Sequence, residues 1–102
     1  MTTTTFEVVA ERARRQLLDL LLTGDRPVGE LVRATGLSQP NTSRHLRVLR
    51  DAGLVQSRVD GQRRLYRLRP EGLAEIERWL APYRSMWRRS LADLERHLDE
   101  EE

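Results

Sequence analysis

The chain has 102 residues, no cysteine and a formal net charge of +2, so a disulfide framework and a thiolate metal site are excluded. No apolar run is long enough to span a membrane, and we expect a single cytoplasmic domain over residues 1–102 with no membrane contact. Residues 1–69 carry 13 arginines against seven acids, whereas residues 70–102 carry five against nine. A basic body with an acidic tail favours a polyanionic partner.

The N-terminal part predicts a polar tail followed by one long helix. Residues 1–5 are polar and are predicted to be disordered. Apolar residues then recur at steps of three and four over 6–22, which predicts an amphipathic helix. The segment Gly24-Asp25-Arg26-Pro27 ends that helix.

Residues 28–52 predict two helices joined by a tight turn. The first is short, and Gly36 after it can take the positive φ that such a turn requires. The second has both ends marked, by Ser38 as a candidate N-cap and by Gly53 as a left-handed C-cap. This arrangement is typical of a helix-turn-helix, whose second helix enters the major groove. An ordinary corner between two helices would share the glycine and the apolar spacing.

The second of these helices has an apolar back and a polar front. Arginine and amide side chains on the front can donate to base edges and phosphates. The DNA contacts expected here are Ser38, Gln39, Pro40, Asn41, Ser43, Arg44 and Arg47. Gln39, Ser43 and Arg44 suit base reading, and Arg47 suits a phosphate. His45 is interpreted as a packed, hydrogen-bonded residue.

After Gly53 the period of the apolar residues changes from 3.6 to two. Residues 55–59 and 64–68 flank Asp60-Gly61, which predicts a β-hairpin and hence a wing over residues 55–69. A solvated basic edge is the plain alternative for such a hairpin. The tip carries three arginines that we expect to contact DNA: Arg58, Arg63 and Arg64.

The C-terminal part predicts a helix with more apolar surface than a small domain can cover. We expect a dimerisation helix over 71–98, which Pro82 kinks or splits near Leu80. Its aromatic-rich stripe favours a two-fold homodimer, to which the helix over 6–22 also contributes. The alternative is that the last turns fold back on their own domain. The expected interface residues are Phe6, Val9, Leu73, Ile76, Trp79, Leu80, Tyr83, Met86, Trp87, Leu91 and Leu94.

The expected fold is mainly α with a small β-hairpin (α+β), a winged helix-turn-helix of order α-α-α-β-β-α. In this order the elements resemble the ArsR family, the arsenical-resistance type of bacterial winged-helix repressors. The resemblance spans roughly Phe6 to Leu98 and implies a homodimer that binds imperfect inverted repeats and represses its own operon. It rests most on Gly36-Leu37-Ser38-Gln39-Pro40, Ser43-Arg44-His45-Leu46 and Ala52-Gly53-Leu54-Val55.

Metal-sensing members of that family carry ligands that this chain lacks. The Cys-x-Cys pair near the second helix is absent. On the last helix His97 and Glu100 match half of the family's other metal site, but Arg84 and Met86 occupy the remaining positions. The resemblance therefore implies a non-metal member with no cofactor and an unknown inducer.

The sequence thus predicts a transcriptional repressor that binds specific double-stranded DNA as a homodimer. A winged helix used only for protein–protein interaction is the alternative, although such a module need not place arginines along the second helix and the wing. No nucleophile–base pair, phosphate-binding glycine loop or carboxylate pair indicates an enzyme.

Overall fold

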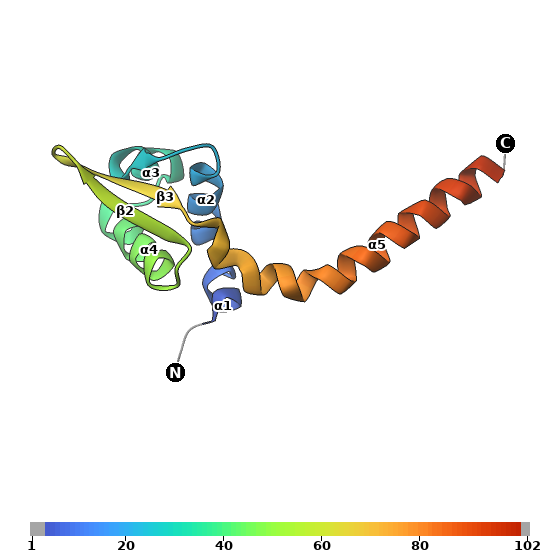
Figure 1. The fold of residues 1–102 in the computed structure, drawn as a ribbon. Coiled ribbons are helices and arrows are strands. Elements are labelled where there is room, and N and C mark those ends of the chain that lie inside the picture. Colours follow the sequence, from blue (N-terminus) through green and yellow to red (C-terminus); the bar gives the residue numbers. More distant parts are fainter. Residues whose placement is uncertain (1–3, 101–102) are drawn as a thin grey trace.

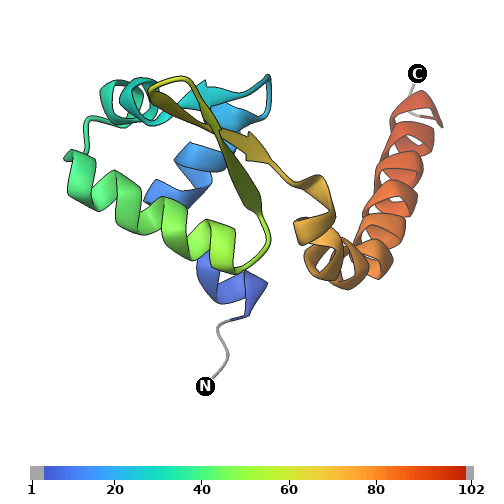
Figure 2. The same cartoon turned by 60° about the vertical axis from the view of Figure 1, so that its left-hand side comes forward.

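The computed structural model describes residues 4–100, which form a small body of helices and strands from which one long helix projects (Figures 1 and 2). The fold is mainly helical with one small antiparallel sheet, as predicted. The elements in chain order are α1 (Thr5–Val9), α2 (Arg12–Leu21), β1 (Arg26–Pro27), α3 (Val28–Thr35), α4 (Gln39–Asp51), β2 (Val55–Asp60), β3 (Arg63–Leu68), the 3-10 helix η1 (Pro70–Leu73) and α5 (Ala74–Glu100).

The single helix predicted over residues 6–22 is wrong, because Ala10 and Glu11 interrupt it between α1 and α2. Glu11 has an extended backbone, with φ −76° and ψ 123°. A side chain of α2 satisfies a carbonyl that the break releases, since Arg15 Nη1 donates to Ala10 O at 2.9 Å. With the break in place Val8 is fully buried in the core.

The predicted disordered tail is wrong where the structure describes it. Thr4 Oγ1 accepts a hydrogen bond from the Glu7 N–H at 3.2 Å and caps α1, and Thr5 is the first residue of that helix. The rest of the predicted tail, residues 1–3, lies outside the described residues.

The helix pair α3 and α4 forms as the sequence predicts. Gly36 has φ 74° and ends α3 in the left-handed conformation. Ser38 Oγ accepts from the Asn41 N–H at 3.2 Å and caps the start of α4. At the other end Gly53 has φ 79°, and its N–H donates to Arg50 O at 3.0 Å. These caps fix where α4 begins and ends.

The sheet has three strands rather than the predicted two. β2 and β3 pair antiparallel, with Asp60 opposite Arg63 at the tip. β1 pairs with the other edge of β3, and this short strand was not predicted. The two residues of the turn are Gly61, at φ 65°, and Gln62. The sequence signal had placed Asp60 and Gly61 in these two positions, so the turn lies one residue later in the chain than predicted. β1 thereby ties the wing to the loop that follows α2.

The core lies among α1, α2, α3, α4 and the side of the sheet that faces α4. Thr42 is buried with the apolar residues, and its hydroxyl donates to Ser38 O at 2.9 Å, so this buried polar group is satisfied. This packing holds one face of α4 inward and leaves the other face free. The largest fully buried side chains besides Thr42 are Val8, Leu17, Leu31, Leu46, Leu49, Leu54 and Val55.

The last helix, α5, is continuous over 27 residues and passes through Pro82, so of the two predicted effects of this proline the helix shows a kink and no split. Figures 1 and 2 show the helix change direction in its orange part, close to the body, as expected where proline removes a backbone donor. Within residues 4–100 no helix, α5 included, is long and apolar enough to cross a membrane. The expected interface residues of α5 that are 47–65% exposed on the single chain are Trp79, Tyr83, Met86, Trp87, Leu91 and Leu94.

Candidate nucleic-acid interface

The outward face of α4 carries the polar residues that the sequence analysis selected. Thr42, Leu46 and Leu49 point into the core, so the opposite side of α4 faces away from the body. All seven residues predicted as DNA contacts in this segment are exposed: Ser38, Gln39, Pro40, Asn41, Ser43, Arg44 and Arg47. They form a continuous surface that begins at the N-terminal end of the helix.

Arg44 is oriented by a neighbour on the same surface. Its Nη2 donates to Asn41 Oδ1 at 3.0 Å, a contact that their three-residue separation on the helix allows. Arg44 is an exposed residue, so its side chain is accessible to a ligand. Arginine with two free donors can bind O6 and N7 of guanine in the major groove.

A hollow of about 250 Å³ lies between α4 and β3 and is rich in arginine. Its lining residues are Ser43, Arg47 and Arg50 of the helix and Arg64 and Tyr66 of the strand. Arg64 Nη1 also donates to Ser57 Oγ at 3.2 Å. No carboxylate among the described residues pairs with Arg47, Arg50 or Arg64. Several guanidinium groups without acidic partners around one hollow suit a phosphate.

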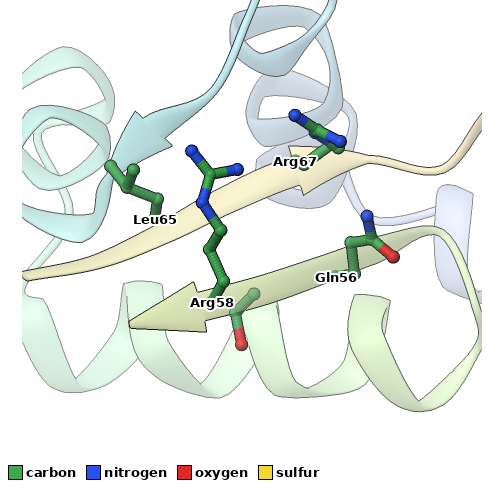
Figure 3. A pocket seen from close by; sticks show the side chains of 5 residues that line it. Gln56, Arg58, Leu65 and Arg67 are labelled. Carbon is green, nitrogen blue, oxygen red and sulfur yellow. The ribbon is translucent and has the colours of Figure 1, made fainter. Parts of the chain in front are cut away.

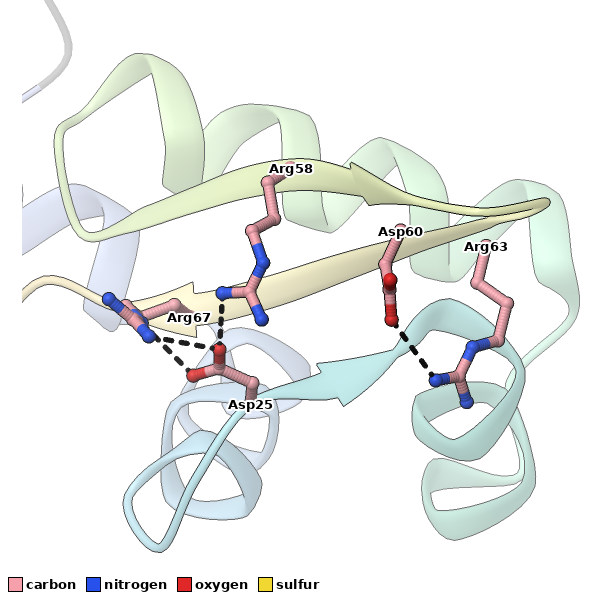
Figure 4. A network of polar contacts seen from close by, with 5 residues as sticks. All are labelled: Asp25, Arg58, Asp60, Arg63 and Arg67. Carbon is pink, nitrogen blue, oxygen red and sulfur yellow. Dashed lines mark hydrogen bonds and ion pairs between the residues drawn. The ribbon is translucent and has the colours of Figure 1, made fainter.

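The opposite face of the hairpin carries arginines that do have acidic partners (Figure 4). Asp25, in the loop before β1, accepts from Arg58 Nη1 at 2.7 Å and from Arg67 Nε and Nη2 at 3.1 and 3.2 Å. Arg63 Nη2 lies 3.4 Å from Asp60 Oδ2. The structure thus separates the three predicted wing contacts, with Arg64 toward α4 and Arg58 and Arg63 on the other side.

The electrostatics of the Asp25 group follow from these contacts. The hydrogen bonds from Arg67, with a smaller contribution from Arg58, hold the pKa of Asp25 below its usual value against the opposing effect of burial. The same contact raises the pKa of Arg67. A hollow of about 280 Å³ lies beside these side chains, lined by Gln56, Ser57, Arg58, Leu65 and Arg67 (Figure 3). Neither Asp25 nor Arg67 was predicted as a site residue, because their contact joins positions 42 residues apart.

His45 is a packed, hydrogen-bonded residue, as predicted. It is partly buried between α4 and α2, and its Nδ1 accepts from Arg14 Nε at 3.3 Å. Burial lowers the pKa of His45, and the charges of Arg14 and Arg44 lower it further. Elsewhere within residues 4–100, no three His, Cys, Asp or Glu side chains lie together in a way that could hold a metal ion.

A glycine turn between two helices, a capped polar second helix and an adjoining basic hairpin together define a winged helix-turn-helix domain. The sequence of this chain is similar to those of known bacterial proteins. Residues 11–57 match the family described as "Bacterial regulatory protein, arsR family". The HTH-type transcriptional regulator Rv2034 of Mycobacterium tuberculosis is 38% identical over 96 residues, which cover 94% of this chain and 87% of the relative.

The fold of this chain is also similar to solved structures of bacterial regulators. A crystal structure of a "Possible transcriptional regulator for arsenical resistance" is 42% identical, with a TM-score of 0.72 and coverage of 90% of this chain and 97% of the other. The solution structure of the "homodimeric winged helix-turn-helix DNA-binding domain" of Mb0332 from Mycobacterium bovis is 32% identical, with a TM-score of 0.64 and coverage of 78% and 74%. This chain belongs to the arsR family of bacterial regulatory proteins, and it is a transcriptional regulator rather than an enzyme.

Proposed function

We propose that this protein is a cytoplasmic repressor that binds an inverted-repeat operator in double-stranded DNA as a homodimer and regulates its own operon. The observation that carries the proposal is the exposed polar surface of α4 beside an arginine-lined hollow without acidic partners. Such a surface offers directional donors for base edges and diffuse positive charge for the backbone, the two components of specific DNA binding.

The N-terminal end of α4 is the base-reading part in this proposal. Gln39, Ser43 and Arg44 are exposed there, and the N-terminal residues of the second helix meet base edges in helix-turn-helix docking. Ser38, Pro40 and Asn41 surround them and contact the backbone of the same half-site. Gln39 can pair with adenine and Arg44 with guanine through two hydrogen bonds each.

The hollow between α4 and β3 is the phosphate-binding part. Arg47 and Arg64 reach it from different elements, and Arg50 adds a third guanidinium that the sequence analysis did not include among the contacts. Arg58 and Arg63 are held by carboxylates on the opposite face of the hairpin. We therefore assign the main wing contact to Arg64, with a lesser contribution from Arg63 and the least from Arg58.

The dimer is proposed to form through α1 and α5. The Phe6 and Trp79 rings meet edge to face at 5.8 Å between centroids, and Trp79 is 5.1 Å from Tyr83, so aromatic surface is continuous from one helix to the other. An apolar hollow of about 310 Å³ adjoins it where α2 meets η1 and α5. The interface residues would be Phe6, Val9, Leu73, Ile76, Trp79, Leu80, Tyr83, Met86, Trp87, Leu91 and Leu94.

Selection of bound sequences from random double-stranded DNA tests the repressor proposal. We expect an inverted repeat with half-sites centred about one helical turn, or a multiple of it, apart. Arg44→Ala should then cost roughly 1–3 kcal/mol per half-site on the selected operator and much less on scrambled DNA. Equal losses on both duplexes would make Arg44 a phosphate contact. Failure to enrich any sequence would favour the protein-interaction alternative.

Sedimentation at micromolar concentration tests the dimer. We expect about twice the 11.9 kDa of one chain. Trp87→Asp should shift the equilibrium to monomer, because an unpaired carboxylate in an apolar interface costs several kcal/mol. Ser85→Asp places the same charge on the same helix outside the stripe and serves as the matched control. A wild-type monomer at tens of micromolar, or equal effects of the two substitutions, would contradict the proposed interface.

A further inference from the structure

One side chain of α2 joins the end of α1 to the DNA-facing helix. Arg14 Nη1 donates to the carbonyl of Val8 at 3.4 Å, and Arg14 Nε donates to Nδ1 of His45 at 3.3 Å. Arg14 and His45 are both partly buried, and Val8 is fully buried in the core. The contact is therefore partly buried between α2 and α4, and His45 directly follows the exposed Arg44 in α4.

This contact requires the neutral form of the histidine. Guanidinium groups only donate hydrogen bonds, so Nδ1 must carry a lone pair and the ring proton must lie on Nε2. Protonation of Nδ1 would remove the acceptor and place a positive imidazolium beside the charges of Arg14 and Arg44, which Glu11 offsets in part. Burial and the two arginines hold the pKa of His45 below 6.5, so the contact forms at neutral pH.

We propose that Arg14 is a positioning residue for DNA binding, which holds α4 through the neutral imidazole of His45, so that acidification weakens operator binding. This inference rests on the proposed function, since it concerns the affinity for an operator. The hydrogen bond itself is a property of the free protein and can be tested without DNA. The core residues of α4 remain packed when the contact is lost, so the expected effect is a moderate change in affinity.

The sign of the pH effect separates this proposal from simple electrostatics. An extra positive charge on α4 would by itself strengthen the attraction to phosphates, so DNA affinity would rise as the pH falls. Loss of the Arg14 contact predicts the opposite, a fall in affinity as His45 takes up its proton. The linkage to stability has the same direction, because a histidine with a lowered pKa stabilises the fold above pH 6.5, and this contribution is lost as the pH falls through the pKa of the folded state.

The first experiment uses NMR on the free wild-type protein. Long-range nitrogen–proton spectra should show the ring proton of His45 on Nε2 at neutral pH. Because the chain has two histidines, the variant His97→Gln is needed to assign the His45 signals. In Arg14→Ala the pKa of His45 should move upward toward its ordinary value. A proton on Nδ1 in the wild type, or an unchanged His45 titration in Arg14→Ala, would overturn the proposal whatever the protein binds.

The second experiment measures operator affinity from about pH 8 to about pH 5.5 at constant ionic strength. Over this fall in pH, the operator affinity of the wild type and of the control His97→Gln should both decrease by about three- to tenfold. This is the factor that one hydrogen bond of this kind contributes. The operator affinity of His45→Asn should not change with pH, because Oδ1 of asparagine can replace Nδ1 as the acceptor and does not titrate. Equal pH profiles for the wild type and His45→Asn would overturn the proposal, whereas absence of operator binding in every variant would count against the proposed function instead.

Discussion

The two faces of the hairpin carry the same kind of residue in different electrostatic surroundings. Toward α4, Arg64 lies with Arg47 and Arg50 around a hollow, and none of the three pairs with a carboxylate among the described residues. On the other face, Arg58 and Arg67 share Asp25 (Figure 4). The number of arginines on a wing therefore does not give the charge available to DNA, which depends on the acids that each face meets.

The alternation of side chains along a strand produces this division. Successive residues of β3 point to opposite faces, so the adjacent Arg63 and Arg64 meet different neighbours. β1 lies at the edge of β3, and Asp25 in the loop before β1 supplies negative charge to one face of the hairpin. The paired face anchors the wing to the body, and the unpaired face remains free for a polyanion.

The largest expected effect comes from Arg64→Ala compared with Arg58→Ala. Removing one phosphate contact per subunit should lower affinity roughly tenfold for each subunit at about 0.1 M salt and reduce the salt slope by about one per contact. Arg58→Ala should lower affinity far less, because the guanidinium it removes is held in an ion pair with Asp25 on the face that points away from α4. Binding titrations at several salt concentrations on operator and scrambled DNA measure both. Equal losses for the two variants would remove the distinction between the faces.

A smaller effect of opposite sign is expected for Asp60→Asn. Its carboxylate lies 3.4 Å from Arg63 at the tip, and both side chains are more than half exposed. Removing the negative charge should free Arg63 and raise DNA affinity by about two- to threefold, with a steeper salt dependence. The same titrations test this prediction, and Arg63→Ala in the Asp60→Asn background should return the affinity to the wild-type value. A loss of affinity in Asp60→Asn would show that the ion pair itself orders the tip for binding.

The smallest expected effect is a lower thermal stability of Asp25→Asn at neutral pH. The pKa of Asp25 is lowered from 3.8, so its ion pairs stabilise the fold above that pH, and the stabilisation is lost as the pH falls through the lowered value. The thermal midpoint of the wild type should exceed that of Asp25→Asn at neutral pH, and the two should converge in strong acid. Calorimetry or circular dichroism across this range provides the measurement, with Asp60→Asn as a control for the loss of a surface carboxylate. A constant difference at every pH would contradict the linkage.

Most of the helix-turn-helix and much of its outward face follow from the sequence. The caps at Ser38 and Gly53 and the turn at Gly36 are local features, and the structure has them where the residues predict them. The apolar spacing of α4 selects the buried face, so the exposed residues could be named without coordinates. Apolar spacing did not predict the break in the helix over 6–22, because the break at Glu11 depends on where Val8 and the arginines of α2 pack.

By itself the sequence determined the elements whose signals lie within a few residues of each other: the caps, the turn glycines, the hairpin and the apolar stripe of α5. Only the tertiary structure decided which arginines are free, because Asp25 meets Arg58 and Arg67 across 33 and 42 residues of chain. It also decided that Gly72 must have no side chain, since a Cβ there would lie 2.3 Å from Gly53 O. Contacts between distant segments depend on how the elements pack, and no local propensity or spacing encodes them.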